Sequence, residues 1–453
     1  MKPSDPRQLA FTVLSQVEEG GFADLSLDAA LARCPGMDPR DRGLATELVY
    51  GVLRQRGRLD FALARFCSKQ LSKVESRVLN LLRLGAYQVL MLDRVPAPAA
   101  VHETVELARR LGLERATGFI NGILRALIRG EGQIPWPDPA ADPLGHLQHG
   151  LSLPAWLARD WLRRYGAQEA AALAEAMAGQ PPFCLRVNTL KGSRDQYLEM
   201  LRAAGHQAEP TVYAPEGVRL TARAAAPLPG DAAGWYQVQD EASMLIAHLL
   251  GARPGERILD ACSAPGGKTT HIAALAENRA GVVALDLHPQ RVRLVEEGAR
   301  RLGCRGIETR AWDLTRPPAF LEPGSFDRVL VDAPCSGLGV LRRNPEIRWR
   351  RGAGDIKRMA ALQGSILDNV AALVRPGGVL VYSLCTLTEA ESEETLARFL
   401  ARQPRFARED LRPLTPPGWA ELFDDQGALR SFPHRHGGMD AFYAVRLRRQ
   451  QGD

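Results

Sequence analysis

Apolar residues recur at helical spacing along residues 1–130. The pattern is plainest in two runs, Leu9-Val13-Leu14-Val17 and Val78-Leu81-Leu82-Ala86-Val89-Leu90. Spacings of three and four residues place such side chains on one face of a helix. A stretch rich in proline, glycine and aspartate follows at residues 130–145, which indicates a linker. We therefore expect an all-helical domain over residues 1–135.

The pattern is mixed over residues 146–235. Helical spacing begins after Ser152, a residue type that often caps helices. A strand-like run at residues 184–190 precedes another helical run at 195–205, and a short strand-like run lies near 218–222. These features predict a small α/β module over residues 146–235.

Short apolar runs alternate with helical stretches from residue 236 onward. The runs are rich in β-branched residues and read RILD, VVALD, GIETRAW, RVLVD and GVLVYSL. Alternation of this kind is typical of a parallel, doubly wound sheet with helices on both faces. We expect this α/β domain to span residues 236–449, which makes the chain a multidomain protein.

Composition narrows the class of protein. The 453 residues carry a formal net charge of +6, which mildly favours a polyanionic partner. No apolar run approaches the ~18 residues of a membrane span, and the first residues do not resemble a secretory signal. The seven cysteines are scattered without a CxxC pair, so neither a disulfide framework nor a zinc site is indicated. We expect a monomeric, cytoplasmic protein with free thiols, no metal and no membrane contact.

A glycine-containing loop, DACSAPGGKT at residues 260–269, follows the first strand of the predicted sheet. Glycines let a backbone approach a ligand closely, and ligands of open α/β sheets bind at the carboxyl ends of the strands. A phosphate-binding loop would need glycine where Cys262 stands, and a GxGxxG motif is absent. A tight turn without a ligand is the alternative. The candidate cofactor residues here are Cys262, Ser263, Ala264, Pro265, Gly266, Gly267 and Lys268.

Acidic residues stand at the ends of the following strands. Asp286 is placed to bind ribose hydroxyls and Asp313 to accept from an adenine amino group, while Asp332 ends the fourth strand. Each acid alone is better explained as a helix cap or a solvated turn residue. Their recurrence on successive strands favours a cofactor site.

Two cysteines follow neighbouring strands, Cys335 in DAPCSG and Cys385 in YSLCT, so both should reach the same edge of the sheet. Such a pair suits methylation of carbon 5 of cytosine, in which a thiolate adds to carbon 6. Lys268 is a candidate for promoting the thiolate, and Asp332 for supporting charge at ring nitrogen 3. The chemistry does not decide which cysteine attacks. The other cysteines read as small apolar residues or, for Cys262, as part of the loop.

The glycine loop and the two cysteine motifs together resemble the RNA 5-methylcytosine methyltransferases of the NOL1/NOP2/Sun type. The resemblance implies a Rossmann-like class I methyltransferase domain that uses S-adenosyl-L-methionine. The helical N-terminal domain is similar to NusB-like RNA-binding domains. The pairing of the two resembles bacterial enzymes that act on small-subunit (16S) ribosomal RNA.

The resemblance also assigns roles. Cys385 would be the nucleophile and Cys335 would serve product release, while residues 239–243 would lie near the methionine end of the cofactor. The chain departs from the family pattern at Leu384, where threonine is usual, and at Ala441, where glycine is usual.

Further expectations concern partners. Residues 341–351 combine arginines with Trp349, which favours contact with RNA phosphates and an unpaired base; a basic helix face with Trp349 in the core is the alternative. His434 and His436 have no carboxylate or cysteine at ligand spacing, so no metal site is expected there. Two other functions remain open, a transfer RNA cytosine-C5 methyltransferase and a non-catalytic RNA-binding factor for ribosome assembly.

Overall fold

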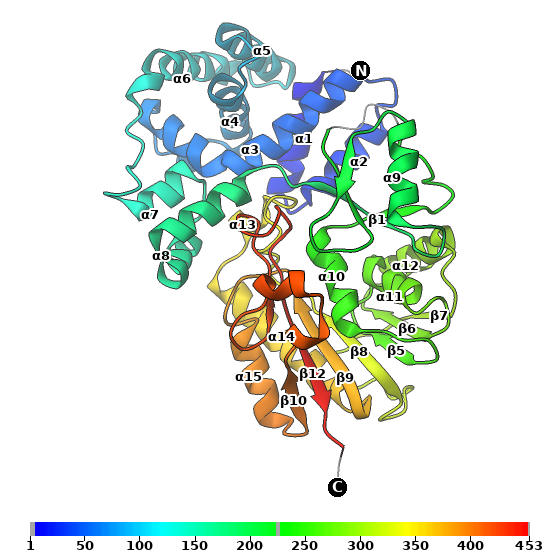
Figure 1. Cartoon of the computed structure of the whole chain (residues 1–453). Helices are drawn as coiled ribbons and strands as arrows, with labels where there is room; N and C mark the ends of the chain where they lie inside the picture. Colours follow the sequence, from blue (N-terminus) through cyan, green and yellow to red (C-terminus); the bar gives the residue numbers. More distant parts are fainter. Residues whose placement is uncertain (1–4, 223–226, 452–453) are drawn as a thin grey trace. The chain divides into compact units, whose positions relative to one another are not determined.

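The computed structural model describes residues 5–222 and 227–451, and the chain divides into two compact units (Figure 1). One unit comprises Met1–Gln180 with Leu341–Arg350, and the other comprises Pro181–Val340 with Arg351–Asp453. Helix α8, which the sequence analysis placed in the middle module, thus belongs to the first unit. The domain limits 1–135, 146–235 and 236–449 remain predictions. None of the helices in the described ranges has the length and apolarity needed to cross a bilayer.

The first unit is helical, as its apolar spacing predicts. Its helices are α1 (Pro6–Glu18), α2 (Ala23–Ala32), α3 (Pro39–Phe66), α4 (Ser76–Met91), α5 (Ala97–Arg110), α6 (Thr117–Gly130), α7 (Pro143–Gly145) and α8 (Ala155–Ala178), with short turns η1 (Leu71–Lys73), η2 (Glu114–Ala116), η3 (Glu131–Gln133) and η4 (His146–Gly150). Fully buried leucines such as Leu48, Leu63 and Leu81 form its core. Ser152 does not cap α8, because its hydroxyl accepts from the Gly57 backbone N–H at 2.8 Å.

The second unit begins with a small antiparallel sheet. Its elements are β1 (Phe183–Val187), α9 (Arg194–Ala203), β2 (Ala208–Pro210), β3 (Gly217–Leu220) and β4 (Tyr236–Val238), with strand order β2-β3-β1-β4. A capping box between Ser193 and Gln196 begins α9. Tyr197 and Leu198 of α9 pack on Leu185 and Val218 of the sheet. This arrangement is the predicted small α/β module.

The large sheet has the order β10-β12-β9-β8-β5-β6-β7, and β11 pairs with β12. Its strands are β5 (Arg257–Asp260), β6 (Gly281–Asp286), β7 (Ile307–Ala311), β8 (Phe326–Asp332), β9 (Val374–Leu384), β10 (Phe406–Glu409), β11 (Leu429–Arg430) and β12 (Tyr443–Arg449). Strands β5 to β9 are parallel, whereas β12 pairs antiparallel with both β9 and β10. The predicted parallel, doubly wound sheet is therefore present, and the antiparallel strand β12 makes the sheet mixed at one edge.

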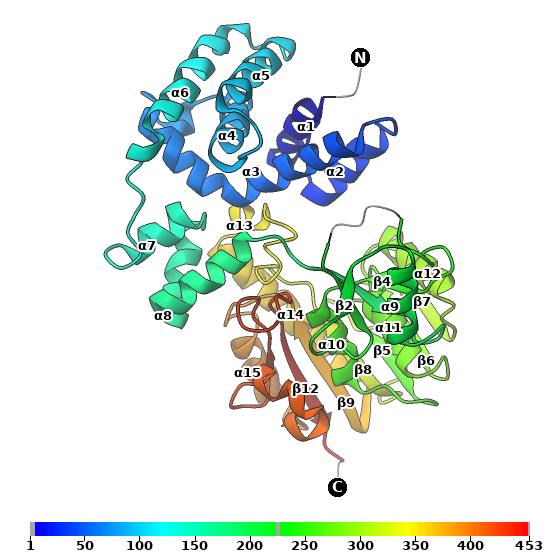
Figure 2. The ribbon, with the colours of Figure 1, turned by 45° about the horizontal axis from the view of Figure 1, so that its top comes forward.

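Alternate residues of the parallel strands face opposite layers. Leu259 and Leu380 belong to the core cluster that includes α14 and α15, whereas Ile258 and Val381 belong to the cluster that includes α10 and α11. Figure 2 shows β8, β9 and β12 side by side between these layers. The helices of this unit are α10 (Glu241–Leu250), α11 (Gly267–Leu275), α12 (Pro289–Leu302), α14 (Ala353–Ala371) and α15 (Glu393–Arg402), with turns η5 (Arg412–Leu414) and η6 (Pro417–Leu422). Helix α13 (Ile347–Arg350) belongs to the first unit. Because β5, β6, β8 and β9 are parallel, their carboxyl ends meet at one edge, where the candidate residues gather.

Candidate active site

The glycine loop runs from the end of β5 into α11. Gly266 adopts φ +101°, and a Cβ there would lie 3.0 Å from Val295 Cα of α12, so both its conformation and its surroundings require glycine. The Ser263 N–H donates to the Leu285 carbonyl of β6 at 2.8 Å. This hydrogen bond ties the loop after β5 to the end of the neighbouring strand β6.

Polar atoms around this loop are left for a ligand. The hydroxyl of Ser263 and one carboxyl oxygen of Asp260 are buried without a hydrogen-bond partner in the described part of the chain. Burial raises the pKa of Asp260 to about 7, although the Thr269 hydroxyl donates to its other oxygen at 2.6 Å. Orphaned buried polar atoms are rare in folded proteins. These atoms, with the glycine backbone, fit a polar cofactor at this position.

Two predicted cofactor acids differ in their surroundings. Asp286, at the end of β6, is 7% exposed and accepts from the Ala264 N–H at 3.2 Å. Asp313 lies beyond β7, where one of its oxygens accepts from the Thr315 N–H at 3.0 Å and the Thr315 hydroxyl at 2.7 Å, and these bonds lower its pKa. Asp286 is thus hydrogen-bonded to the glycine loop, whereas the carboxylate of Asp313 stabilises its own turn.

Lys268 and Asp332 form an ion pair with 2.6 Å between Nζ and Oδ2. Burial lowers the pKa of Lys268, but the Asp332 carboxylate outweighs burial and raises it, so the lysine carries a charge. The Ser383 hydroxyl donates to the other oxygen of Asp332 at 2.7 Å. The structure thus brings these predicted residues together as a charged pair. In Cys262, by contrast, burial raises the thiol pKa well above its usual value.

The two cysteines lie in contact, with 3.0 Å between Cys335 Sγ and Cys385 Sγ. The Gly339 N–H donates to the Cys385 carbonyl at 2.9 Å, which ties the two loops together. The hydrogen bond with the Cys385 sulfur and, after it, burial raise the pKa of Cys335 well above that of an ordinary thiol. Either sulfur can be the donor in this contact, so the geometry alone leaves the two roles open.

Leu384, the first departure from the family pattern, does not point into this site. Its side chain is fully buried in the core cluster of α14 and α15, and it stands opposite Tyr443 in the sheet. An apolar residue suits that position. The backbone of Ala441, the second departure, packs closely against Gly339. A Cβ on Gly339 would lie only 2.0 Å from the Ala441 carbonyl oxygen.

Two buried charged residues near the site escaped the sequence analysis. Glu391 lies within TEAESEE, which resembles a solvated acidic run, yet its side chain is fully buried. Arg186 lies in the apolar strand β1 and is 2% exposed. A charged residue within an otherwise apolar strand was the available signal for Arg186. The sequence around Glu391 held none.

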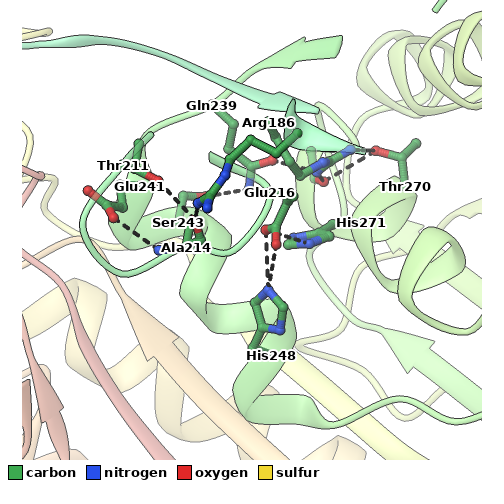
Figure 3. A network of polar contacts seen from close by, with 12 residues as sticks. Arg186, Thr211, Ala214, Glu216, Gln239, Glu241, Ser243, His248, Thr270 and His271 are labelled. Atoms are coloured by element: carbon green, nitrogen blue, oxygen red, sulfur yellow. Dashed lines mark hydrogen bonds and ion pairs between the residues drawn. The ribbon is translucent and has the colours of Figure 1, made fainter. Parts of the chain in front are cut away.

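Arg186 connects the small module to the cofactor loop (Figure 3). Its guanidinium donates to the Gly267 carbonyl, to Thr270 Oγ1 at 2.9 Å and to Gln239 Oε1 at 2.5 Å. Gln239 belongs to the segment expected near the methionine end of the cofactor. In the same segment, Glu241 accepts from backbone N–H groups of the small module, including that of Ala214 at 3.0 Å.

Glu216, His248 and His271 form the one group in the described ranges whose ligand-type atoms lie within metal-binding distance of one another. The Glu216 carboxylate lies 3.0 Å from His248 Nε2 and 2.9 Å from His271 Nε2 (Figure 3). Burial and then the charge of Arg186 lower the pKa of His271 to about 4. A divalent cation would add charge beside that buried guanidinium, whereas Glu216 and Arg186 already balance each other. The geometry favours a structural network.

The basic segment at residues 341–351 does not match the expectation of RNA contact. Residues 341–350 belong to the first unit, where Arg348 is fully buried and donates to the Met177 and Ser152 carbonyls at 3.0 and 3.2 Å. Trp349 Nε1 donates to the Leu53 carbonyl at 3.2 Å. Arg348 does not lie on a solvated basic face either, because it is buried and satisfies backbone carbonyls; only the inward placement of the partly buried Trp349 agrees with the alternative.

Comparisons with known proteins agree with this architecture. Residues 247–448 match the family described as 16S rRNA methyltransferase RsmB/F, residues 4–129 match the NusB family, and residues 153–226 match the ferredoxin-like domain of RsmF/B-like methyltransferases. These matches confirm the predicted fold class.

Two of the individual relatives extend over nearly the whole chain. The "Probable ribosomal RNA small subunit methyltransferase B" of Bacillus subtilis (strain 168) is 37% identical over 99% of this chain and 100% of its own length. The crystal structure of PH0851 is 23% identical with a TM-score of 0.80 over 98% of each chain, which shows the shared fold. A methyltransferase homologue from Pyrococcus horikoshii is 28% identical with a TM-score of 0.58, covering 69% of this chain and 100% of that chain.

Proposed function

Because the chain belongs to the ribosomal RNA small subunit methyltransferase B family, we propose that it methylates carbon 5 of a cytosine in 16S ribosomal RNA through a covalent cysteine adduct. The observation that carries the proposal is the contact between Cys335 and Cys385 beside the Lys268–Asp332 pair. Carbon 5 of cytosine is a weak nucleophile, and addition of a thiolate to carbon 6 activates it.

Cys385 is the attacking residue in this proposal. The assignment follows the family resemblance; in it, the Cys335 thiol, with its sulfur 3.0 Å away, donates an S–H hydrogen bond that stabilises a thiolate on Cys385. The positive charge of Lys268 acts on Cys385 as well, since that sulfur is among the groups that raise the pKa of Lys268. A neighbouring cation favours the thiolate form of a cysteine.

S-adenosylmethionine, when bound, supplies a methyl group on a positively charged sulfur. The Cys385 thiolate forms a bond to carbon 6, and the displaced electron pair moves toward ring nitrogen 3, where Asp332, in its carboxylic-acid form, donates a proton or a hydrogen bond and Lys268 supplies a balancing positive charge. Carbon 5 would then form a bond to the methyl group of the bound cofactor, the methyl–sulfur bond would break, and the neutral thioether S-adenosylhomocysteine would leave. A base passes the carbon 5 proton to solvent, the carbon 5–carbon 6 double bond re-forms, and the bond from carbon 6 to Cys385 breaks. Cys335 assists release by donating to the departing thiolate.

The proposal also assigns the cofactor contacts to the glycine loop and to the acids at the strand ends. Residues 262–268 would surround the methionine and ribose portions, Asp286 would bind the ribose hydroxyls, and Asp313 would reach the adenine amino group. A cytosine within a duplex would have to leave its stack to reach the cysteines, so a loop or an opened helix is the expected substrate. Such RNA would be met in the cytoplasm.

The test uses cysteine variants with 16S ribosomal RNA and radiolabelled S-adenosylmethionine. We expect Cys385→Ala to abolish methyl transfer, because no thiolate adds to carbon 6. Cys335→Ala should accumulate a protein–RNA adduct that survives denaturing electrophoresis. An adduct trapped by Cys385→Ala instead would reverse the two roles.

Bisulfite mapping of cellular RNA, with and without the protein, separates the remaining functions. Loss of one cytosine methylation in 16S ribosomal RNA supports the proposal, and loss in transfer RNA would move the activity to that substrate. Unchanged methylation in every RNA would leave the protein as a non-catalytic assembly factor.

A further inference from the structure

Glu391 is a buried carboxylate between the two cysteine loops. It lies after β9 and before α15, and its side chain has no exposed surface. Ser336, which directly follows Cys335, donates to it through its backbone N–H at 2.8 Å and its hydroxyl at 2.5 Å. The residue after Cys385 is Thr386, whose hydroxyl lies 3.2 Å from the same carboxylate. One side chain therefore reaches the residue that follows each cysteine.

Each hydrogen-bond donor around the Glu391 carboxylate can be assigned to an acceptor. Oε1 accepts from Ser336 N and from Gln363 Nε2 at 3.0 Å, while Oε2 accepts from the hydroxyls of Ser336 and Thr388, the latter at 2.6 Å. These donors fill the roughly four lone-pair positions of a carboxylate. The Thr386 hydroxyl is then free to donate to Ser336 Oγ at 2.7 Å, which joins the two loops directly.

The backbone of Glu391 is fixed as well. The Tyr382 hydroxyl, on β9, donates to the Glu391 carbonyl at 2.6 Å. Gln363, on α14, donates both to the Glu391 carboxylate and to the Pro334 carbonyl at 3.0 Å, next to Cys335. A fully satisfied buried network of this kind is rigid, because each lost bond leaves an unpaired polar group.

We propose that Glu391 is a positioning residue for the cysteine pair: its carboxylate holds the loop after β8 and the loop after β9 at the spacing at which the two sulfurs touch. Glu391 contacts no reacting atom in this role. Its importance for catalysis rests on the proposed cytosine chemistry, whereas the spacing itself can be measured without RNA.

The spacing is measured by oxidising the full-length protein with diamide under native conditions. Each thiol loses its proton, the two sulfurs form a bond, and diamide takes up the two electrons and two protons to become the hydrazine. Peptide mass mapping after alkylation of the remaining thiols gives the rate at which Cys335 becomes linked to Cys385. Glu256→Ala is the matched control, because it removes a carboxylate paired with Arg328 at the opposite, amino ends of β5 and β8.

We expect Glu391→Ala to slow this cross-link by about tenfold or more. Glu391→Asp should slow it to a similar extent, because the shorter side chain cannot reach Ser336 in the loop after β8. Glu391→Gln has the full length and its amide can bond to the hydroxyls, so its rate should stay within about threefold of the unaltered protein. Glu256→Ala should cross-link at the normal rate. If Glu391→Ala fails to fold by circular dichroism, the comparison of Asp with Gln decides.

Methyl-transfer kinetics provide the second readout. Glu391→Asp should lower kcat while leaving the KM for S-adenosylmethionine unchanged, and Glu391→Gln should restore most of kcat. Normal cross-linking rates in both Glu391→Ala and Glu391→Asp would overturn the proposal. Full methylation by Cys385→Ala would refute the cytosine mechanism instead, and the cross-linking series would still report the role of Glu391 in spacing.

Discussion

The cofactor loop and the cysteine loops end neighbouring strands of one sheet, but buried charges of opposite sign hold them. A cation, Arg186, binds the cofactor loop and comes from the small module, more than one element away in the chain. An anion, Glu391, binds the cysteine loops and comes from the segment directly after Cys385. The difference teaches that the cysteine pair is built within the catalytic domain, whereas the cofactor loop depends on a second module. We therefore expect a substitution of Arg186 to impair the cofactor loop without affecting the cysteine loops, and a substitution of Glu391 to have the opposite effect.

Loss of Arg186 should have the largest effect. Arg186→Met leaves the Gly267 carbonyl and Glu216 without their buried cation, so the free energy of unfolding should fall by about 3 to 5 kcal/mol. The Kd for S-adenosylmethionine should rise by about tenfold or more, because the cofactor loop loses its hydrogen bonds to Arg186. Calorimetric unfolding and isothermal titration measure the two quantities.

Arg186→Lys is the control, because it keeps the positive charge without the forked guanidinium. We expect its free energy of unfolding and its Kd for S-adenosylmethionine to lie between those of the unaltered protein and those of Arg186→Met. The cross-linking rate of Cys335 with Cys385 should stay normal in Arg186→Met, since no part of that pair depends on the small module. A slowed cross-link with unchanged cofactor binding would contradict the separation of the two halves.

The second largest expected effect is a loss of stability at acid pH, through the network of Arg186, Glu216 and His271 beside the cofactor loop. Burial, followed by Arg186, lowers the pKa of His271 to about 4, whereas an unfolded histidine titrates near 6.5. Between pH 6.5 and 4, His271 therefore binds a proton in the unfolded chain but not in the folded protein. The stabilisation present above pH 6.5 is lost as the pH falls toward 4, and the free energy of unfolding decreases by about 3 kcal/mol. Glu216, whose pKa is lowered by both His271 and His248 against the effect of burial, adds a loss in the same direction below its ordinary pKa.

Urea unfolding at a series of pH values checks this dependence. His271→Gln has no imidazole to titrate, so the slope of stability between pH 6.5 and 4 should be shallower than in the unaltered protein. An identical slope in His271→Gln would assign the acid sensitivity to another group.

How much the sequence revealed depended on where each residue's partner lay. Cys335, Cys385 and Lys268 could be placed because strand ends of a parallel sheet share an edge, whatever the exact packing. Arg348 was misjudged because its partners are backbone carbonyls of α8 and neighbouring segments, which composition does not reveal. Glu391 was missed for the same reason. Its buried state follows from hydroxyl and amide donors brought together by folding, while its sequence neighbours are acidic and partly exposed.

The smallest expected effects separate the two cofactor acids. Asp286 is buried against the loop, so Asp286→Asn should raise the Kd for S-adenosylmethionine by about tenfold, the value of a hydrogen bond to a charged acceptor. Asp313 shares its carboxylate with Thr315, so Asp313→Asn should raise the Kd only about twofold. Isothermal titration of both variants, with cross-linking of the cysteines as the control for the other half, measures this ratio. An equal loss in the two variants would mean that the turn at Asp313 contributes as much to the cofactor site as the loop beside Asp286.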